Sequence, residues 1–262
     1  MEAQLVETAI LNIINHQSLI ATKASRVVFA ANGDGVMEFG LRRAQGPDAG
    51  LYGARAAMIG GCVGTSNVLA GQLFDVPVLG THAHSWIMSF PDEYTAFRAY
   101  ADLYPDNCTL LVDTYDTLKS GVPNAIRVFQ EMKDSGNPLK RYGIRLDSGD
   151  LAYLSKEARK MLDEAGFKDA VIAASNDLDE YLLHDLKMQQ AAITSWGVGT
   201  NLITSKDCPS FGGVYKLAAI QDESGAFIPK IKIPKIRKKS QIPETKPFSG
   251  FMIRPPAKSA LI

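Results

Sequence analysis

The sequence predicts an α/β fold whose catalytic core is a (β/α) barrel, and two observations support this. Short apolar strands alternate with amphipathic helical segments, which implies parallel strands joined by right-handed crossovers. Polar or small residues also follow several strands directly, at Asp113, Asp147, Ser175 and Gly199. A barrel gathers the carboxyl ends of its strands around one mouth, whereas a doubly wound sheet places its ligand at one switch point. We therefore favour the barrel, with the number of strands left open.

The expected elements start with a helix over residues 3–24, where an apolar cluster at 10–14 is followed one and two turns later by another at 19–21. The strand candidates are 36–39, 76–79, 109–113, 142–147, 170–175, 195–198 and 214–220. The helical patterns among them are 49–59, 65–73, 91–103, 118–134, 151–166 and 177–190.

Length and composition fit one large domain or two small ones, since the chain has 262 residues and is 46% hydrophobic. Cys62, Cys108 and Cys208 are odd in number and lack paired spacing, which disfavours a disulfide scaffold or a cysteine zinc site and favours a reducing compartment. The N-terminus lacks a basic start followed by an apolar run, and no segment approaches membrane-spanning length. We expect a cytoplasmic protein with no membrane partner.

The segment 80–85, Gly-Thr-His-Ala-His-Ser, follows the strand candidate 76–79 and has the most reactive side chains of any predicted loop. A lone histidine is more often structural than catalytic. Two histidines and two hydroxyls on one strand-end loop favour a functional role. Imidazole serves as a nucleophile or a proton carrier near neutral pH.

Charged residues end two further strands. Asp113 follows an apolar strand, where a catalytic carboxylate and a turn cap are about equally expected. Alternation places Arg145 and Asp147 on one face of the next strand. A guanidinium there binds a carboxylate or phosphate bidentately, with Asp147 orienting it or binding a hydroxyl. The structural alternative is a plain ion pair, with Asp150 as a helix cap.

Three loops have residues suited to an anion. Residues 175–177 (Ser-Asn-Asp) and 197–201 (Gly-Val-Gly-Thr-Asn) follow two consecutive late strands. Glycine lets the backbone approach a ligand, and the last two βα-loops of a barrel are its usual phosphate site. A single Gly-x-Gly is a weak signal that this position strengthens. Arg42 and Arg43, just beyond the first strand, fit a polyanionic substrate better than a solvated surface.

In combination, these residues resemble the nicotinate phosphoribosyltransferase family, in its bacterial type, from about residue 3 to residue 232. The matching segments are 39–46, 64–71, 80–90, 111–115, 143–151 and 196–202. The resemblance implies a barrel of the type II phosphoribosyltransferase kind, incomplete here. It implies that nicotinate and phosphoribosyl pyrophosphate give nicotinate mononucleotide and pyrophosphate in NAD salvage, with ATP hydrolysis and Mg²⁺.

The resemblance also implies roles for single residues. His84 matches the family's transiently phosphorylated histidine, with Ser85 placed to position the phosphoryl group and His82 left to a structural role. The expected catalytic residues are His84, Asp113 and Asp147. The expected substrate-binding residues are Arg42, Ser66, Ser85 and Arg145. The residues expected at the ribose 5-phosphate are Ser175, Asn176, Gly197 and Gly199. No magnesium ligand is assigned.

Other functions stay open beside this one. A sister transferase acting on nicotinamide or quinolinate would have much the same residues. A remnant that binds phosphate without turnover is the alternative outside the enzymes. A generic phosphate-binding barrel isomerase would leave the ordered motifs unexplained.

Relative to the family, we expect two departures. The N-terminal domain that normally precedes the helix at 3–24 is absent; family members form head-to-tail homodimers in which that domain contributes to the partner's site. Residues 1–233 form the catalytic barrel domain, and 234–262 form a basic, proline-rich tail. From Lys230 onward, nine Lys or Arg residues stand against one acid, Glu244. A nucleic-acid-binding extension is one interpretation. We favour a frameshift near Pro234, because codons chosen within the degeneracy of the residues from Pro234 onward can encode a family-like turn and strand when read two nucleotides later, and we expect no nucleic-acid partner.

Overall fold

The computed structural model describes residues 2–136 and 140–230. The chain divides into two compact units, Met1–Tyr215 and Lys216–Ile262. The expected tail over 234–262, with its frameshift near Pro234, lies outside the described residues. None of the described helices has both the length and the apolar character needed to cross a bilayer.

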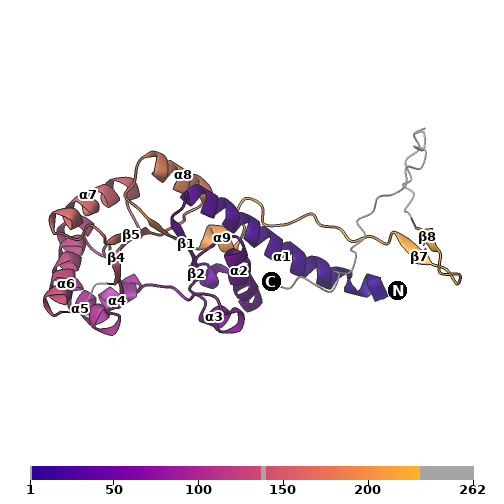
Figure 1. Cartoon of the computed structure of the whole chain (residues 1–262), viewed down its shortest axis with the longest axis horizontal. Coiled ribbons are helices and arrows are strands. Elements are labelled where there is room, and N and C mark those ends of the chain that lie inside the picture. Colours follow the sequence, from indigo (N-terminus) through magenta and orange to yellow (C-terminus); the bar gives the residue numbers. More distant parts are fainter. Residues whose placement is uncertain (1, 137–139, 231–262) are drawn as a thin grey trace. The chain divides into compact units, whose positions relative to one another are not determined.

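The first unit contains one parallel sheet of six strands, curled into a half-barrel (Figure 1). Its strands are β1 Gly35–Glu38, β2 Gly64–Thr65, β3 Asn107–Leu111, β4 Arg141–Leu146, β5 Val171–Ala174 and β6 Ser195–Val198. The spatial order is β2-β1-β6-β5-β4-β3, so the first strand pairs with the last, and Glu38 lies opposite Val198. Sequential strands that run around an arc and meet first to last are typical of a barrel. The fold prediction is confirmed.

Helices connect and cover these strands. They are α1 Glu2–Ala31, α2 Pro47–Ile59, α3 Val68–Phe74, α4 His84–Met88, α5 Glu93–Leu103, α6 Val122–Asp134, α7 Leu151–Glu164, α8 Glu180–Met188 and α9 Thr200–Ile203, with a 3₁₀ turn η1 at Leu41–Arg43 and a π turn η2 at Thr117–Gly121. Asp92, Asp150 and Asp179 cap α5, α7 and α8 through side-chain oxygens. Asp is common at N-caps, because its side-chain oxygens accept hydrogen bonds from the free N–H groups of the first turn. Asp150 therefore caps α7, as the structural alternative for this segment predicted.

The core lies between the sheet and its helices. Trp196, Phe97 and Phe129 are its largest fully buried side chains, and Leu110, Leu146 and Ile172 from three neighbouring strands join them. Trp196 also donates its indole N–H to Asp34 Oδ2 at 2.9 Å, which satisfies the one polar atom of the ring.

Two strand predictions were wrong. In 76–79 only Val78 pairs, as a single bridge to Thr65, because Pro77 has no N–H to donate to a ladder. The segment 214–220 adds no strand to the sheet. Only its end enters β7 Ala219–Gln221, which pairs antiparallel with β8 Phe227–Pro229 in the second unit. The sequence of a short apolar run does not reveal which strand, if any, pairs with it. These two strand predictions therefore rested on apolar character alone.

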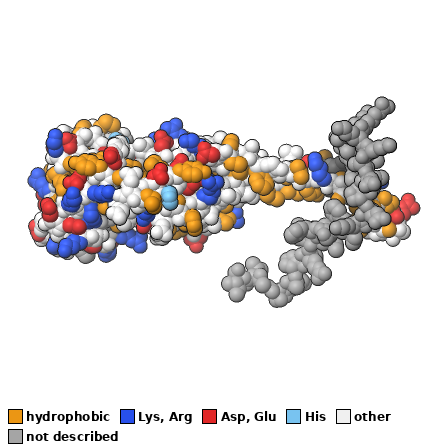
Figure 2. All heavy atoms as spheres, turned by 90° about the horizontal axis from the view of Figure 1, so that it is seen from above, with side chains coloured by type: hydrophobic (Ala, Val, Ile, Leu, Met, Phe, Trp, Pro, Cys, Tyr) orange, Lys and Arg blue, Asp and Glu red, His pale blue; other side chains and the backbone are white. Residues whose placement is uncertain are grey.

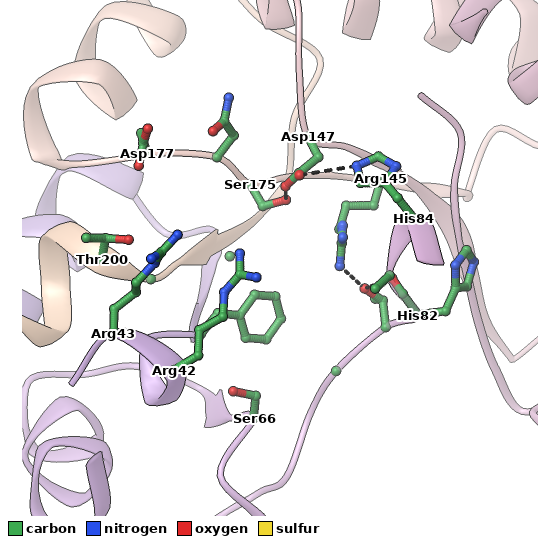
Figure 3. A pocket seen from close by; sticks show the side chains of 17 residues that line it. Arg42, Arg43, Ser66, His82, His84, Arg145, Asp147, Ser175, Asp177 and Thr200 are labelled. Atoms are coloured by element: carbon green, nitrogen blue, oxygen red, sulfur yellow. Dashed lines mark hydrogen bonds and ion pairs between the residues drawn. The ribbon is translucent and has the colours of Figure 1, made fainter. Parts of the chain in front are cut away.

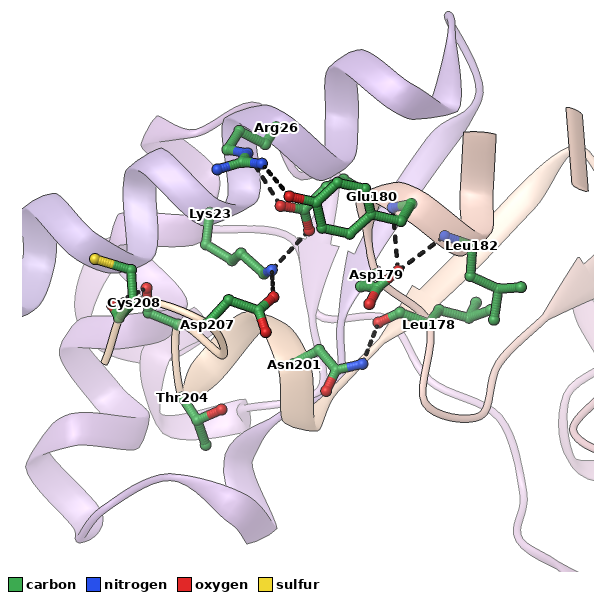
Figure 4. Close-up of polar contacts among 12 residues, drawn as sticks. Lys23, Arg26, Leu178, Asp179, Glu180, Leu182, Asn201, Thr204, Asp207 and Cys208 are labelled. Atoms are coloured by element: carbon green, nitrogen blue, oxygen red, sulfur yellow. Dashed lines mark hydrogen bonds and ion pairs between the residues drawn. The ribbon is translucent and has the colours of Figure 1, made fainter. Parts of the chain in front are cut away.

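A buried ion cluster joins α1 to α8 (Figure 4). Lys23 Nζ lies 2.7 Å from Glu180 Oε2, and the two side chains are 5% and 7% exposed. Arg26 Nε contacts the other oxygen of Glu180 at 3.0 Å, and Asp207 Oδ2 lies 3.4 Å from Lys23 Nζ. A buried charge destabilises the fold unless an opposite charge lies beside it. This cluster therefore holds α1 against α8.

We expect Lys23→Met to lower the free energy of unfolding by about 3 kcal/mol, because it leaves the buried Glu180 with one cation fewer. Urea denaturation followed by circular dichroism measures the change. The matched control is Lys140→Met, since the Lys140–Asp106 pair at 3.0 Å is 60% and 67% exposed, and exposed pairs contribute about 1 kcal/mol or less. Equal effects of the two substitutions would contradict a structural role for the buried pair.

Candidate functional site

The loops after β1, β4, β5 and β6 and the segment 80–84 surround a cavity of about 440 Å³ (Figure 3). Nine of the residues predicted for the site line it: Arg42, Ser66, His84, Arg145, Asp147, Ser175, Asn176, Gly197 and Gly199. They meet because parallel strands deliver their carboxyl ends to one rim, and the pairing of β1 with β6 brings the first loop beside the last. Asp113 and Ser85 do not line the cavity.

His84 begins α4 and lies between a hydroxyl and two carboxylates. Its Nδ1 is 3.1 Å from Thr114 Oγ1. Its Nε2 faces the cavity, 3.4 Å from Asp147 Oδ2 and 3.9 Å from Asp113 Oδ1. The side chain is 36% exposed, so the ring is accessible while its orientation is held from the Nδ1 side.

Asp113 stands behind the cavity wall. Its side chain is only 2% exposed, and Oδ2 accepts hydrogen bonds from the Asp147 amide at 2.8 Å and the Ser148 hydroxyl at 2.6 Å. These bonds hold the loop that bears Asp147. Among the described residues, Oδ1 has no hydrogen-bond partner, and it points toward His84 Nε2. The carboxylate thus orients its neighbours and contributes negative charge at the imidazole.

Ser85 is exposed in the first turn of α4 and lies outside the cavity lining. It follows His84 directly, and successive helical residues diverge by about 100° around the axis. The resemblance that singled out Ser85 is a match of sequence positions and gives no direction for the side chain.

Arg145 and Asp147 share the cavity face, as alternation along β4 predicted. Arg145 Nη1 donates to Thr81 Oγ1, and Ser175 Oγ donates to Asp147 Oδ1. Burial lowers the pKa of Arg145, while the charges of Asp147 and Asp113 act to raise it. None of the ion pairs formed by the described residues includes Arg145, and its buried Nε lacks a partner there. The plain ion-pair alternative is therefore not realised, and the guanidinium is available to a ligand.

The opposite wall has the features of an anion site. Asn176 and Asp177 have left-handed backbones, with φ of 88° and 42°, which turn the chain sharply after β5. Gly197 and Gly199 must be small: a Cβ on Gly197 would lie 2.6 Å from the Phe39 ring, and one on Gly199 would lie 3.1 Å from the Phe39 carbonyl oxygen. Close packing of the first loop against the last therefore requires both glycines.

Sequence reasoning left several lining residues outside the assigned site: Phe39, Arg43, Thr81, Asp177 and Thr200. Each lies within a segment that the sequence analysis singled out (39–46, 80–85, 175–177 or 197–201), so the available signal was membership of a motif. Phe39 adds an aromatic face to a largely polar cavity, and Arg43 adds a second guanidinium beside Arg42 (Figure 3).

His82 makes structural contacts, the role left to it when the resemblance assigned His84 to the chemistry. It is 7% exposed, its Nε2 accepts the Leu111 amide of β3 at 3.2 Å, and its ring packs edge-on against Tyr100 at 4.6 Å. This bond attaches the segment 80–84 to the open edge of the sheet. Burial, and secondarily the charge of Arg145, lowers the pKa of His82 to about 4.

Comparisons with known proteins show the family of the chain. The model of the nicotinate phosphoribosyltransferase (NAPRTase) family matches residues 35–242. The chain belongs to this family. It is 59% identical over 233 residues to nicotinate phosphoribosyltransferase of Bacillus subtilis, a match that covers 89% of this chain and 46% of that protein. It is 33% identical over 297 residues to the Homo sapiens protein of the same name, which covers 93% of this chain and 54% of that one.

Solved structures of the family and of a related enzyme share the fold. The crystal structure of human nicotinic acid phosphoribosyltransferase matches with a TM-score of 0.68 and 33% identity, over 75% of this chain and 50% of that one. Nicotinate-nucleotide pyrophosphorylase from Pyrococcus furiosus matches with a TM-score of 0.63 and 25% identity, over 91% and 63% of the two chains. The chain spans about half the length of the curated relatives it matches.

We expect acidification to destabilise the fold through His82. A histidine whose pKa falls from its unfolded value of about 6.5 to about 4 binds its proton mainly when unfolded, so its stabilisation is full above pH 6.5 and is lost as the pH falls toward 4. Urea denaturation between pH 4.5 and 7 measures this. His82→Gln, whose side-chain oxygen replaces the ring acceptor, should flatten the pH dependence. The exposed variant His184→Gln should not, and parallel curves for all three proteins would refute the assignment.

Proposed function

We propose that this chain performs the ATP-coupled nicotinate phosphoribosyltransferase reaction, which forms nicotinate mononucleotide and pyrophosphate from nicotinate and phosphoribosyl pyrophosphate in NAD salvage. The observation that carries the proposal is the division of the cavity into two sides. Arg42, Arg43 and the glycine loops form one side, which also includes Asp177, while Asp147, the His84 imidazole and Arg145 form the other (Figure 3). A phosphorylated sugar that loses a diphosphate needs both kinds of group.

The chemistry follows from this division. Departure of pyrophosphate leaves positive charge on the ribose ring, as in the oxocarbenium-like transition state of glycoside hydrolysis. Asp147 faces the cavity and stabilises that charge, while Asp113 fixes the Asp147 backbone through its 2.8 Å bond. The guanidinium groups bind the phosphates bidentately. Arg145, buried and without an ion-pair partner among the described residues, is placed to bind the carboxylate of nicotinate.

For the ATP step, we assign His84 Nε2 as the phosphoryl acceptor. Nδ1 lies 3.1 Å from the Thr114 hydroxyl, and in the tautomer in which Nδ1–H donates to Oγ1 the lone pair is on Nε2, which faces the cavity. In this step Nε2 forms a bond to the γ-phosphorus of ATP, and the bond between that phosphorus and the bridging oxygen breaks, which releases ADP. Hydrolysis of the N–P bond by water returns the free imidazole and phosphate.

Magnesium would be held at the carboxylate side. Among the described residues, no group of three or more His, Cys, Asp or Glu side chains is placed to hold a metal ion. Mg²⁺ commonly binds one or two carboxylates together with substrate phosphates and water, so Asp147, which lines the cavity, fits an ion that arrives with its phosphates. When bound, the ion supplies neutralising charge to the phosphates.

The proposal includes a homodimer in the cytoplasm. The free state of Cys62, Cys108 and Cys208 supports a reducing compartment. Exposed apolar side chains on α1, including Leu5 at 79% and Ile13 at 58%, support a protein interface there (Figure 2).

A second candidate is a sister transferase, which the match to nicotinate-nucleotide pyrophosphorylase keeps open. Purified protein supplied with phosphoribosyl pyrophosphate, Mg²⁺ and ATP is offered nicotinate, nicotinamide or quinolinate, and pyrophosphate release is measured. We expect release with nicotinate, because Arg145 pairs with a carboxylate and a neutral amide offers no charge. Preference for either other pyridine would overturn the assignment. Binding of phosphoribosyl pyrophosphate without release from any of them would identify a non-catalytic remnant.

The role of His84 has its own test. Incubation with ATP labelled at the γ-phosphate should give protein-bound label that is stable to alkali and lost in acid, as phosphohistidine is. His84→Ala should abolish it, and the exposed His184→Ala should keep it. Label that survives in His84→Ala would assign the phosphoryl group to another residue.

A further inference from the structure

Glu38, the last residue of β1, has a buried carboxylate. Its side chain is completely inaccessible, and its backbone is paired with Thr65 of β2 on one side and Val198 of β6 on the other. Burial raises the pKa of Glu38, against the opposing effects of its hydrogen bonds. An apolar residue would fill this position at less cost, so the carboxylate calls for an explanation.

The two oxygens of this carboxylate bind two different loops. Oε1 accepts the Gly40 amide, at the start of η1. Oε2 accepts the Thr65 hydroxyl at 2.6 Å, and that hydroxyl accepts the Asn67 amide at 3.0 Å. A backbone bond from Ser66 N to Glu38 O, also 3.0 Å long, lies alongside.

The cavity depends on both of these loops. Gly40 opens the 3₁₀ turn that carries Arg42 and Arg43, and its carbonyl accepts the Arg43 amide at 2.8 Å. Ser66 lies between Thr65 and Asn67, the two residues tied through the threonine hydroxyl. Arg42, Arg43 and Ser66 line the cavity, while Glu38 itself does not.

The first loop is also confined from behind. A Cβ added at Gly40 would lie 2.3 Å from Cβ of Ile203 in α9, so the loop cannot retreat toward the last helix of the unit. Steric contact with Ile203 and the hydrogen bond to Glu38 together set the position of the loop. One buried side chain, that of Glu38, therefore sets the position of Arg42 relative to Ser66.

We infer that Glu38 is a positioning residue of the phosphate-binding wall, which acts through Gly40 and Thr65 to fix Arg42 and Ser66 relative to each other. The inference rests on the proposed function in so far as the ligand of that wall is phosphoribosyl pyrophosphate. The placement of the two loops is a property of the protein and is tested separately from the ligand.

Thr65→Val gives the sharper test, because Glu38→Ala would open a void in the core and threaten folding. Valine has nearly the shape of threonine but lacks the hydroxyl, so it breaks the link between Glu38 and the second loop. Thr65→Ser keeps the hydroxyl and serves as the rescue. Ser155→Ala is the matched control, since Ser155 is equally buried and its hydroxyl accepts the Ala192 amide at 3.1 Å outside the cavity lining.

Titration calorimetry with phosphoribosyl pyrophosphate should show about tenfold weaker binding for Thr65→Val, with Thr65→Ser within about twofold of the wild type. Ser155→Ala should lose stability in urea yet bind as the wild type does. Wild-type affinity in Thr65→Val, or an equal loss in Ser155→Ala, overturns the inference.

Hydrogen–deuterium exchange without ligand provides the independent measurement. In Thr65→Val, exchange should rise at residues 66–67 and across η1 relative to the wild type, and in Ser155→Ala it should not. If wild-type protein fails to bind phosphoribosyl pyrophosphate, the proposed function is wrong, and the exchange data alone decide whether Glu38 positions the loops. Unchanged exchange in Thr65→Val refutes the positioning role in either case.

Discussion

The pairing of β1 with β6 is the contact on which the cavity depends. It joins residues 35–38 to 195–198 in parallel register, so the first strand of the sheet lies beside the last. The loops after β1 and β6 start at neighbouring points as a result, and Phe39 packs against Gly197 and Gly199. A doubly wound sheet built from the same segments would place those loops at separate positions. Each group on this wall therefore has its place because β1 pairs with β6 inside the curled sheet.

The other side of the arc uses side chains in place of strand pairing. Between β2 and β3 the sheet is open, and the segment 80–84 runs along that opening. His82 accepts the Leu111 amide, Thr81 accepts a hydrogen bond from Arg145, and His84 contacts Thr114. A continuous strand here would alternate its side chains and present only every second one to the cavity. An irregular segment places Thr81 and His84 there while satisfying the edge of β3 through His82.

Much of this arrangement was accessible from the sequence, for a definable reason. Strands 142–147, 170–175 and 195–198 were found within about one residue at each end, because buried parallel strands are near-continuous apolar runs bounded by polar loops. Position at a strand end then identified Asp147, Ser175 and Gly199. The two predicted site residues that do not line the cavity share one cause as well. Asp113 and Ser85 were placed on the correct loops, but whether a side chain faces the cavity depends on the local backbone path. For Asp113 that path turns the carboxylate behind the wall, to the Asp147 amide.

The electrostatics around His84 connect the two halves of the proposed reaction. With two carboxylate oxygens within 3.9 Å of Nε2, the imidazole faces a concentration of negative charge that repels an incoming phosphoryl group. A phosphoryl donor can approach only with its charge neutralised, and in the proposed reaction Mg²⁺ and the guanidinium groups across the cavity would supply that neutralisation. Once Nε2 is phosphorylated, the same carboxylates stand beside a dianionic group, and their repulsion favours release of that group to water. In the proposed reaction, Asp147 would stabilise the positive ribose and, together with Asp113, would shorten the lifetime of the phosphohistidine. Asp147 would therefore take part in both the ATP step and the transfer step.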